Sequence, residues 1–201
     1  MTSAPKKIFL QTLIGSLCVS ALIAIFIFLL GSFGEIEVRI LLTTLTIGCY
    51  SLTGLCCAAL GEKRPSSVLA PTGMLVSVIG FLVNTVTIWE IADIDDTWQT
   101  VVILHILAVA LAHAALMLHI QPRANHVRSS LAGTLVMIGI VAGMLIALVL
   151  AEGDINSEFY FRLIGVFAIL DVLGTIVTPI LHKMSSAISS AQSPVTDYPQ
   201  E

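Results

Sequence analysis

Long apolar blocks alternate with short polar segments along the whole chain. The blocks cover residues 8–30, 40–60, 68–89, 98–120, 129–150 and 159–181, and each is 21 to 23 residues long. A helix needs about 20 apolar residues to cross about 30 Å of hydrocarbon. Because backbone groups in lipid must find hydrogen-bond partners within their own segment, the blocks predict helices rather than strands. The pattern therefore predicts an all-α, polytopic integral membrane protein with six transmembrane helices.

The polar segments between the blocks are too short to hold a soluble domain. We therefore expect one transmembrane domain over residues 1–184, followed by a polar tail over residues 185–201. The tail contains serine and proline and few large apolar residues, a composition typical of disorder. Composition agrees with a membrane location, since 57% of the chain is hydrophobic and only 11% is charged, against about 25% charged in soluble domains.

Basic residues gather on one side of the predicted membrane. That side holds Lys6, Lys7, Lys63, Arg64, Arg123, Arg128 and Lys183. By the positive-inside rule both termini are then cytoplasmic, as in a multi-pass protein of a cell membrane such as the bacterial inner membrane. Most acidic residues fall in the opposite loops. Their densest run, residues 90–96, lacks the glycine and the spacing of an EF-hand loop, so we predict no metal site there.

The six predicted helices group into three tandem helical hairpins of similar layout. Residues 67–72 (SVLAPT) resemble residues 129–134 (SSLAGT), and Glu90 then aligns with Glu152. Each hairpin has a basic inner entry, an apolar run, an acidic outer turn and a second apolar run. Such parallel repeats occur in transporters and elsewhere. The layout resembles small six-span bacterial membrane proteins, such as the short-repeat family that includes the acid-resistance membrane protein. This resemblance is limited to architecture and implies no site residues.

One carboxylic acid, Asp171, falls in the middle of the last apolar block. It lies nine residues after Arg162, or about 13.5 Å along a helix at 1.5 Å per residue. Burial at that depth is costly, so the side chain should face other helices and find a partner there. Thr175 is a candidate partner one turn later, and Asn84 and Tyr50 are candidates on other helices. Asp171 is either a proton or cation site, or a polar clamp between helices.

The fourth block carries three histidines, His105, His113 and His119. His105 and His119 share a helix face, as in proteins that hold haem between facing helices, but no other apolar block supplies an opposing histidine. Hydrogen-bonded packing is therefore favoured for these residues over haem ligation. The four cysteines all lie inside apolar blocks, without a C-x-x-C motif, and are expected to act as small apolar side chains. Gly139 and Gly143 form a G-x-x-x-G pair, which permits close helix approach.

The chain contains no catalytic or nucleotide-binding motif, and basic residues are sparse. We therefore predict no enzymatic activity, no cofactor and no nucleic-acid partner. Two functions remain open. The first is an accessory or structural membrane protein that acts through helix packing, in the lipid bilayer, with its own copies or with another membrane protein. The alternative is a transporter or channel for protons, cations or a small molecule, in which Asp171 is the coupling group.

Overall fold

The protein consists of six helices in the part of the chain that the computed structural model describes. The described residues are 4–30, 34–91, 97–122, 125–152, 155 and 157–191. The helices are α1 (Ala4–Leu30), α2 (Glu35–Lys63), α3 (Leu69–Ile88), α4 (Thr97–Leu118), α5 (Asn125–Leu150) and α6 (Glu158–Ala191). All six are long and apolar enough to cross a membrane. The predicted all-α, six-span membrane architecture is therefore confirmed.

The last helix is longer than its apolar block. α6 continues to Ala191, past the point where the polar tail was expected to begin, and residues 192–201 lie outside the described part. Pro179 consequently sits inside the helix, whereas the sequence suggested a place in its last turn. Proline has no N–H group, so the carbonyl of Thr175 receives no helical hydrogen bond from it.

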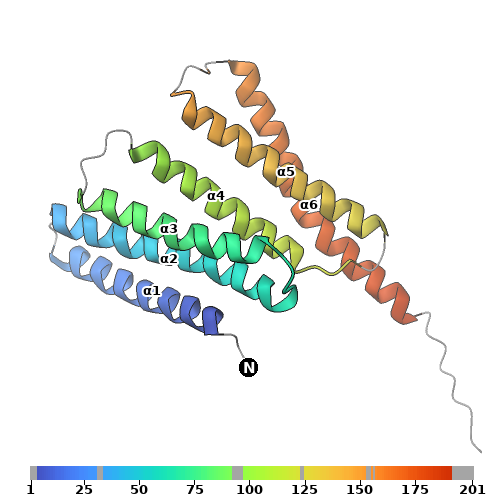
Figure 1. Ribbon diagram of the computed structural model, residues 1–201, viewed down its shortest axis with the longest axis horizontal. Coiled ribbons are helices and arrows are strands. Elements are labelled where there is room, and N and C mark those ends of the chain that lie inside the picture. Colours follow the sequence, from blue (N-terminus) through green and yellow to red (C-terminus); the bar gives the residue numbers. More distant parts are fainter. Residues whose placement is uncertain are drawn as a thin grey trace, which may run out of the picture.

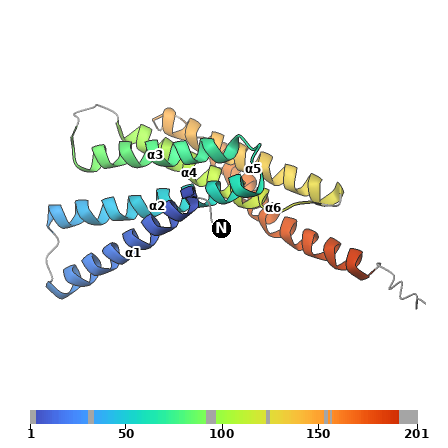
Figure 2. The ribbon, with the colours of Figure 1, turned by 60° about the horizontal axis from the view of Figure 1, so that its bottom comes forward.

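The helices pack largely in the order of the chain. Neighbouring pairs contact each other along the whole series, and α2 additionally packs against α4. Figures 1 and 2 show the resulting arrangement, with α1 on one side of the molecule and the α5–α6 pair on the other. α4 lies between the α2–α3 pair and the α5–α6 pair, so its side chains reach both pairs.

Glycines set the closest helix contacts. A Cβ atom at Gly80 would overlap the Tyr50 ring, one at Gly73 would overlap Cys57, and one at Gly174 would overlap Thr134. Each of these glycines therefore allows a neighbouring helix to come near. The expected role of Gly139 and Gly143 is not seen, because a Cβ atom at either would meet nothing within 4 Å. Their face of α5 is open in the single chain.

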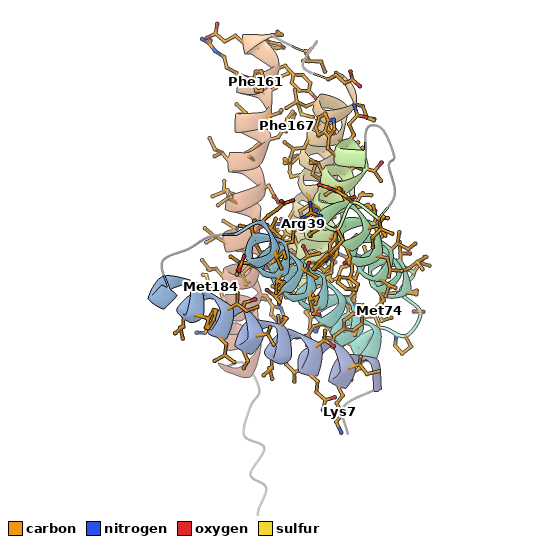
Figure 3. All side chains as sticks on the ribbon, turned by 90° about the vertical axis from the view of Figure 1, so that its left-hand side faces the viewer. Lys7, Arg39, Met74, Phe161, Phe167 and Met184 are labelled. Atoms are coloured by element: carbon orange, nitrogen blue, oxygen red, sulfur yellow. The ribbon has the colours of Figure 1, made fainter. Side chains whose placement is uncertain are left out.

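The first and last helices are covered least by the rest of the chain. Ser16 is the buried residue among the described side chains of α1, and Thr178 is the one in α6. Phe161 and Met184, near the two ends of the α6 span, are 50% and 57% exposed, and both are labelled in Figure 3. In water such faces would be unstable, whereas in a bilayer lipid tails solvate them.

Polar contacts at one end of the helices join successive hairpins. Arg39 at the start of α2 lies 3.0 Å from the Glu90 carboxylate just after α3. Gln99 at the start of α4 donates a hydrogen bond of 2.6 Å to the Glu152 carboxylate just after α5. Glu90 and Glu152 also share a left-handed backbone, with φ of 50° and 47°. The first hairpin is thus linked to the second, and the second to the third, by a glutamate at the same position of each hairpin.

Candidate functional site

His113 on α4 is held in one orientation by Thr175 on α6. Its Nε2 lies 2.9 Å from the Thr175 hydroxyl oxygen. That hydroxyl donates its own hydrogen to the backbone carbonyl of Asp171, at 2.8 Å. Because a hydroxyl has one hydrogen to donate, its oxygen must accept from His113. The Nε2 atom therefore carries a proton, and the other ring nitrogen, Nδ1, is turned toward Asp171.

His113 and Asp171 face each other across the boundary between α4 and α6. The Nδ1 atom lies 3.7 Å from Oδ2 of the carboxyl group, a distance that suits an ion pair but is too long for a direct hydrogen bond. With Nε2 already protonated, a neutral ring would turn its lone pair toward the carboxyl oxygen. A further proton on either group would turn this contact into an attractive one.

The second oxygen of Asp171 has no partner. Among the described side chains, Oδ1 is the buried polar atom without a hydrogen bond, and the Asp171 side chain is only 14% exposed. Buried polar atoms are nearly always paired, and an unpaired one requires an explanation such as an absent ion or ligand. Asp171 therefore retains unused capacity to bind a proton or another donor.

A cavity of about 300 Å³ lies beside this acid, between α4, α5 and α6. Three polar side chains line it, namely His105, His113 and Asp171. The remaining lining is apolar and consists of Ile106, Val109, Ala110, Ile138, Val141, Ala142 and Leu145. An apolar pocket with a few convergent polar groups is the usual form of a small-molecule site.

His105 belongs to a second polar cluster, which lies toward α2 and α3. Its Nδ1 is 2.9 Å from the carbonyl of Val101, and since a carbonyl only accepts, this nitrogen carries the hydrogen. Its Nε2 lies 3.3 Å from the side-chain amide of Asn84 on α3. The hydroxyl of Tyr50 on α2 lies 3.3 Å from Nδ1. Both ring nitrogens are thus engaged within the protein, which leaves neither for haem iron.

A further cavity, of about 500 Å³, adjoins the neighbouring face of α4, against α2. Tyr50, His105 and His113 all line it, together with Cys49 and Cys56. The two histidines therefore border both cavities. Within the described residues no group of three His, Cys, Asp or Glu side chains could hold a metal ion.

The structure brings the predicted polar residues together in pairs that the sequence did not indicate. Thr175 lies beside Asp171 as expected, but its role is to orient His113. Asn84 and Tyr50, which were candidate partners of Asp171, contact His105 instead. The facing partner of Asp171 is His113, which was named as a candidate residue but not as that partner. No sequence signal identified this pair, because it depends on how α4 and α6 are rotated.

No protein-family model matches the chain, and neither a curated protein nor a solved structure shows significant similarity to it.

Proposed function

We propose that this protein is a membrane carrier for a cation, driven by or coupled to protons, with Asp171 as the coupling group. The observation that carries the proposal is the buried, unpaired Oδ1 of Asp171 beside a cavity that His105 and His113 also line. An ionisable residue at this depth of a membrane is most readily explained by an ion or proton pathway.

Coupling follows from the chemistry of the pair. With no cation bound, a proton on Asp171 or on His113, 3.7 Å away, offsets the carboxylate charge. A cation that binds the carboxylate supplies the same positive charge, so the proton can then leave. Two positive charges at one buried acid would repel each other strongly. The site therefore favours either the proton or the cation, which is the requirement for exchange.

The hairpin arrangement supports a carrier over a simple polar clamp. We propose that the three hairpins are repeats, on the basis of the matching contacts of Arg39 with Glu90 and Gln99 with Glu152. The candidate site then lies between α4 of the second hairpin and α6 of the third. Transporters built from parallel repeats commonly bind substrate near the midplane between repeats. We place the protein in a cell membrane with both termini in the cytoplasm, following its basic residues.

Flux measurements test this proposal. The protein is reconstituted in liposomes that contain a pH-sensitive dye, and sodium, potassium or a small organic ammonium ion is added outside. Wild-type protein should move protons in response to at least one of these cations. Asp171→Asn keeps the size and shape of the side chain but cannot take up the charge, so its flux should fall to the level of protein-free liposomes.

Glu158→Gln is the matched control, because this acid lies on the same helix, is 81% exposed and pairs with Arg162, whose side chain is 74% exposed. Its flux should equal that of the wild type. Absence of flux in wild-type protein with all three cations, or full flux in Asp171→Asn, would refute the carrier proposal.

An accessory or structural function is the second candidate, and the exposure of α1 and α6 favours it. Both helices turn most of their apolar side chains away from the chain, so each could pack against another membrane protein or a second copy. On this hypothesis Asp171 is a polar clamp. Asp171→Leu would then lower stability, while wild-type protein would carry no cation-dependent flux.

A further inference from the structure

We propose that the ligand of the α4–α5–α6 cavity is an amphipathic organic cation, specifically a secondary or tertiary amine in its protonated form. This inference rests on the proposed function and deepens it by naming the substrate class. In the bound state the ammonium N–H donates to the carboxylate of Asp171, which lines the cavity. The apolar body of the amine fills the remainder of the space.

The size of the cavity favours an organic ligand. Its volume is about 300 Å³, whereas a cavity of about 150 Å³ already accommodates benzene. A proton or a single metal ion would leave most of this space empty. A ring with a short amine substituent matches it in size.

The lining selects the charge of the ligand. Among the described lining residues there is one carboxyl group and no lysine or arginine, so an anion would find no counter-charge. A metal cation such as Ca²⁺ needs six or more oxygen ligands, and this lining supplies the two oxygens of Asp171. An organic cation can exchange its weaker hydration for apolar contacts, because much of its surface is hydrocarbon.

The scarcity of acceptors selects the class of amine. His105 already uses both ring nitrogens, and the Nε2 of His113 points to Thr175. The carboxylate of Asp171 is thus the charged acceptor of the cavity, since Oδ1 has no hydrogen bond within the described residues and Oδ2 lies 3.7 Å from His113. A primary ammonium has three N–H donors, so beside the two oxygens of one carboxylate and an apolar lining at least one donor would stay unpaired. A tertiary amine has one N–H donor, which matches one acceptor.

The position of Val109 indicates how the ligand enters. This side chain lines the cavity and is also 66% exposed on the surface of α4. The cavity therefore reaches the lipid-facing side of the protein. Amphipathic amines concentrate in bilayers, so entry from the membrane suits this class of ligand.

Binding of N,N-dimethylbenzylamine and of isobutylbenzene, its uncharged carbon analogue, tests the inference. Both are titrated calorimetrically into the full-length protein in lipid nanodiscs, with empty nanodiscs as the blank. The protonated amine should bind at least tenfold more tightly than the hydrocarbon. Benzylamine, a primary amine, and benzyltrimethylammonium, which has no N–H, should both bind more weakly than the tertiary amine.

Variants separate charge recognition from general damage. Asp171→Asn should weaken amine binding at least tenfold and leave hydrocarbon binding unchanged. Ala142→Leu, which reduces the cavity volume, should weaken both ligands, and Glu158→Gln should change neither. Equal affinity of wild type for the amine and the hydrocarbon would overturn the inference. An equal loss of both ligands in Asp171→Asn would overturn it too.

The two proposals can fail separately. Saturable, Asp171-dependent amine binding without any flux would retain this site and end the carrier proposal. Proton or sodium flux that needs Asp171, without amine binding, would retain the carrier and reject the amine as its substrate.

Discussion

The Nδ1 atom of His113 and the Oδ2 atom of Asp171 face each other at 3.7 Å inside the span region. Thr175 fixes this relationship, since its hydroxyl bonds to the other ring nitrogen of His113 and to the backbone of Asp171. These three side chains, from α4 and α6, place a proton on Nε2 of His113 and leave Oδ1 of Asp171 without a hydrogen bond in the described part of the chain. The predictions below test the parts of this arrangement and the packing that supports it.

Thr175→Val should free the His113 ring to change its orientation, while a side chain of nearly the same size stays at position 175. Valine has nearly the same shape but no hydroxyl, so the 2.9 Å contact to His113 is lost. Interhelical hydrogen bonds in membranes contribute about 0.6 kcal/mol on average, which is the expected fall in unfolding free energy. Nitrogen NMR of labelled histidine should show that His113 no longer holds its proton only on Nε2.

Thr85→Val is the control for this change, because Thr85 also donates to a carbonyl four residues earlier, at 2.8 Å, within its own helix. It should leave the His113 signals unchanged. If Thr175→Val leaves them unchanged as well, Thr175 does not orient the ring.

Asn84 and His105 should be energetically coupled. Asn84 lies 3.3 Å from Nε2 of His105, so either single alanine substitution leaves the other group without this partner. A double-mutant cycle with Asn84→Ala and His105→Ala should give a coupling free energy between about 0.6 kcal/mol, the average for such pairs in membranes, and about 1.7 kcal/mol, the largest value. Unfolding of the four proteins in mixed detergent measures it. Asn84→Ala with Thr175→Val should be additive within about 0.5 kcal/mol, because these side chains belong to different clusters.

Gly80→Ala should be much more harmful than Gly139→Ala. The added methyl group at Gly80 would overlap the Tyr50 ring, whereas at Gly139 it would meet nothing within 4 Å. Overpacking of this kind typically costs about 1–3 kcal/mol. The Tm of Gly80→Ala should therefore fall by several degrees, and that of Gly139→Ala should stay the same or rise. A fall of equal size in both would show that Gly139 packs against a partner helix.

Single cysteines at opposite ends of α3 should react from opposite sides of the membrane. Ile91→Cys should react with an impermeant maleimide in intact cells, and Ser66→Cys only after the cells are opened, because basic residues mark the latter side as cytoplasmic. Both positions are exposed. The native cysteines all lie in spanning helices, so wild-type protein is the unlabelled control. The reverse pattern would place both termini outside the cytoplasm.

The sequence by itself determined the number of helices and their approximate extents, and it placed Asp171 near the middle of the last span. A helix that crosses the hydrocarbon core needs about 20 apolar residues, so each apolar run of that length indicates one span. The sequence also singled out Asp171, Thr175, Asn84 and the histidines, since polar groups are costly in the middle of such a run.

Only the tertiary structure decided which of these residues meet. In a soluble helix the apolar stripe reveals the buried face, but a helix in lipid is apolar on its inner and outer faces alike, so the pattern carries little information about rotation. The approach of His113 to Asp171, the contact of Asn84 with His105 and the open face at Gly139 all depend on that rotation. Close contacts such as Gly80 against Tyr50 help to set it, and they arise from the fit of side chains on separate helices.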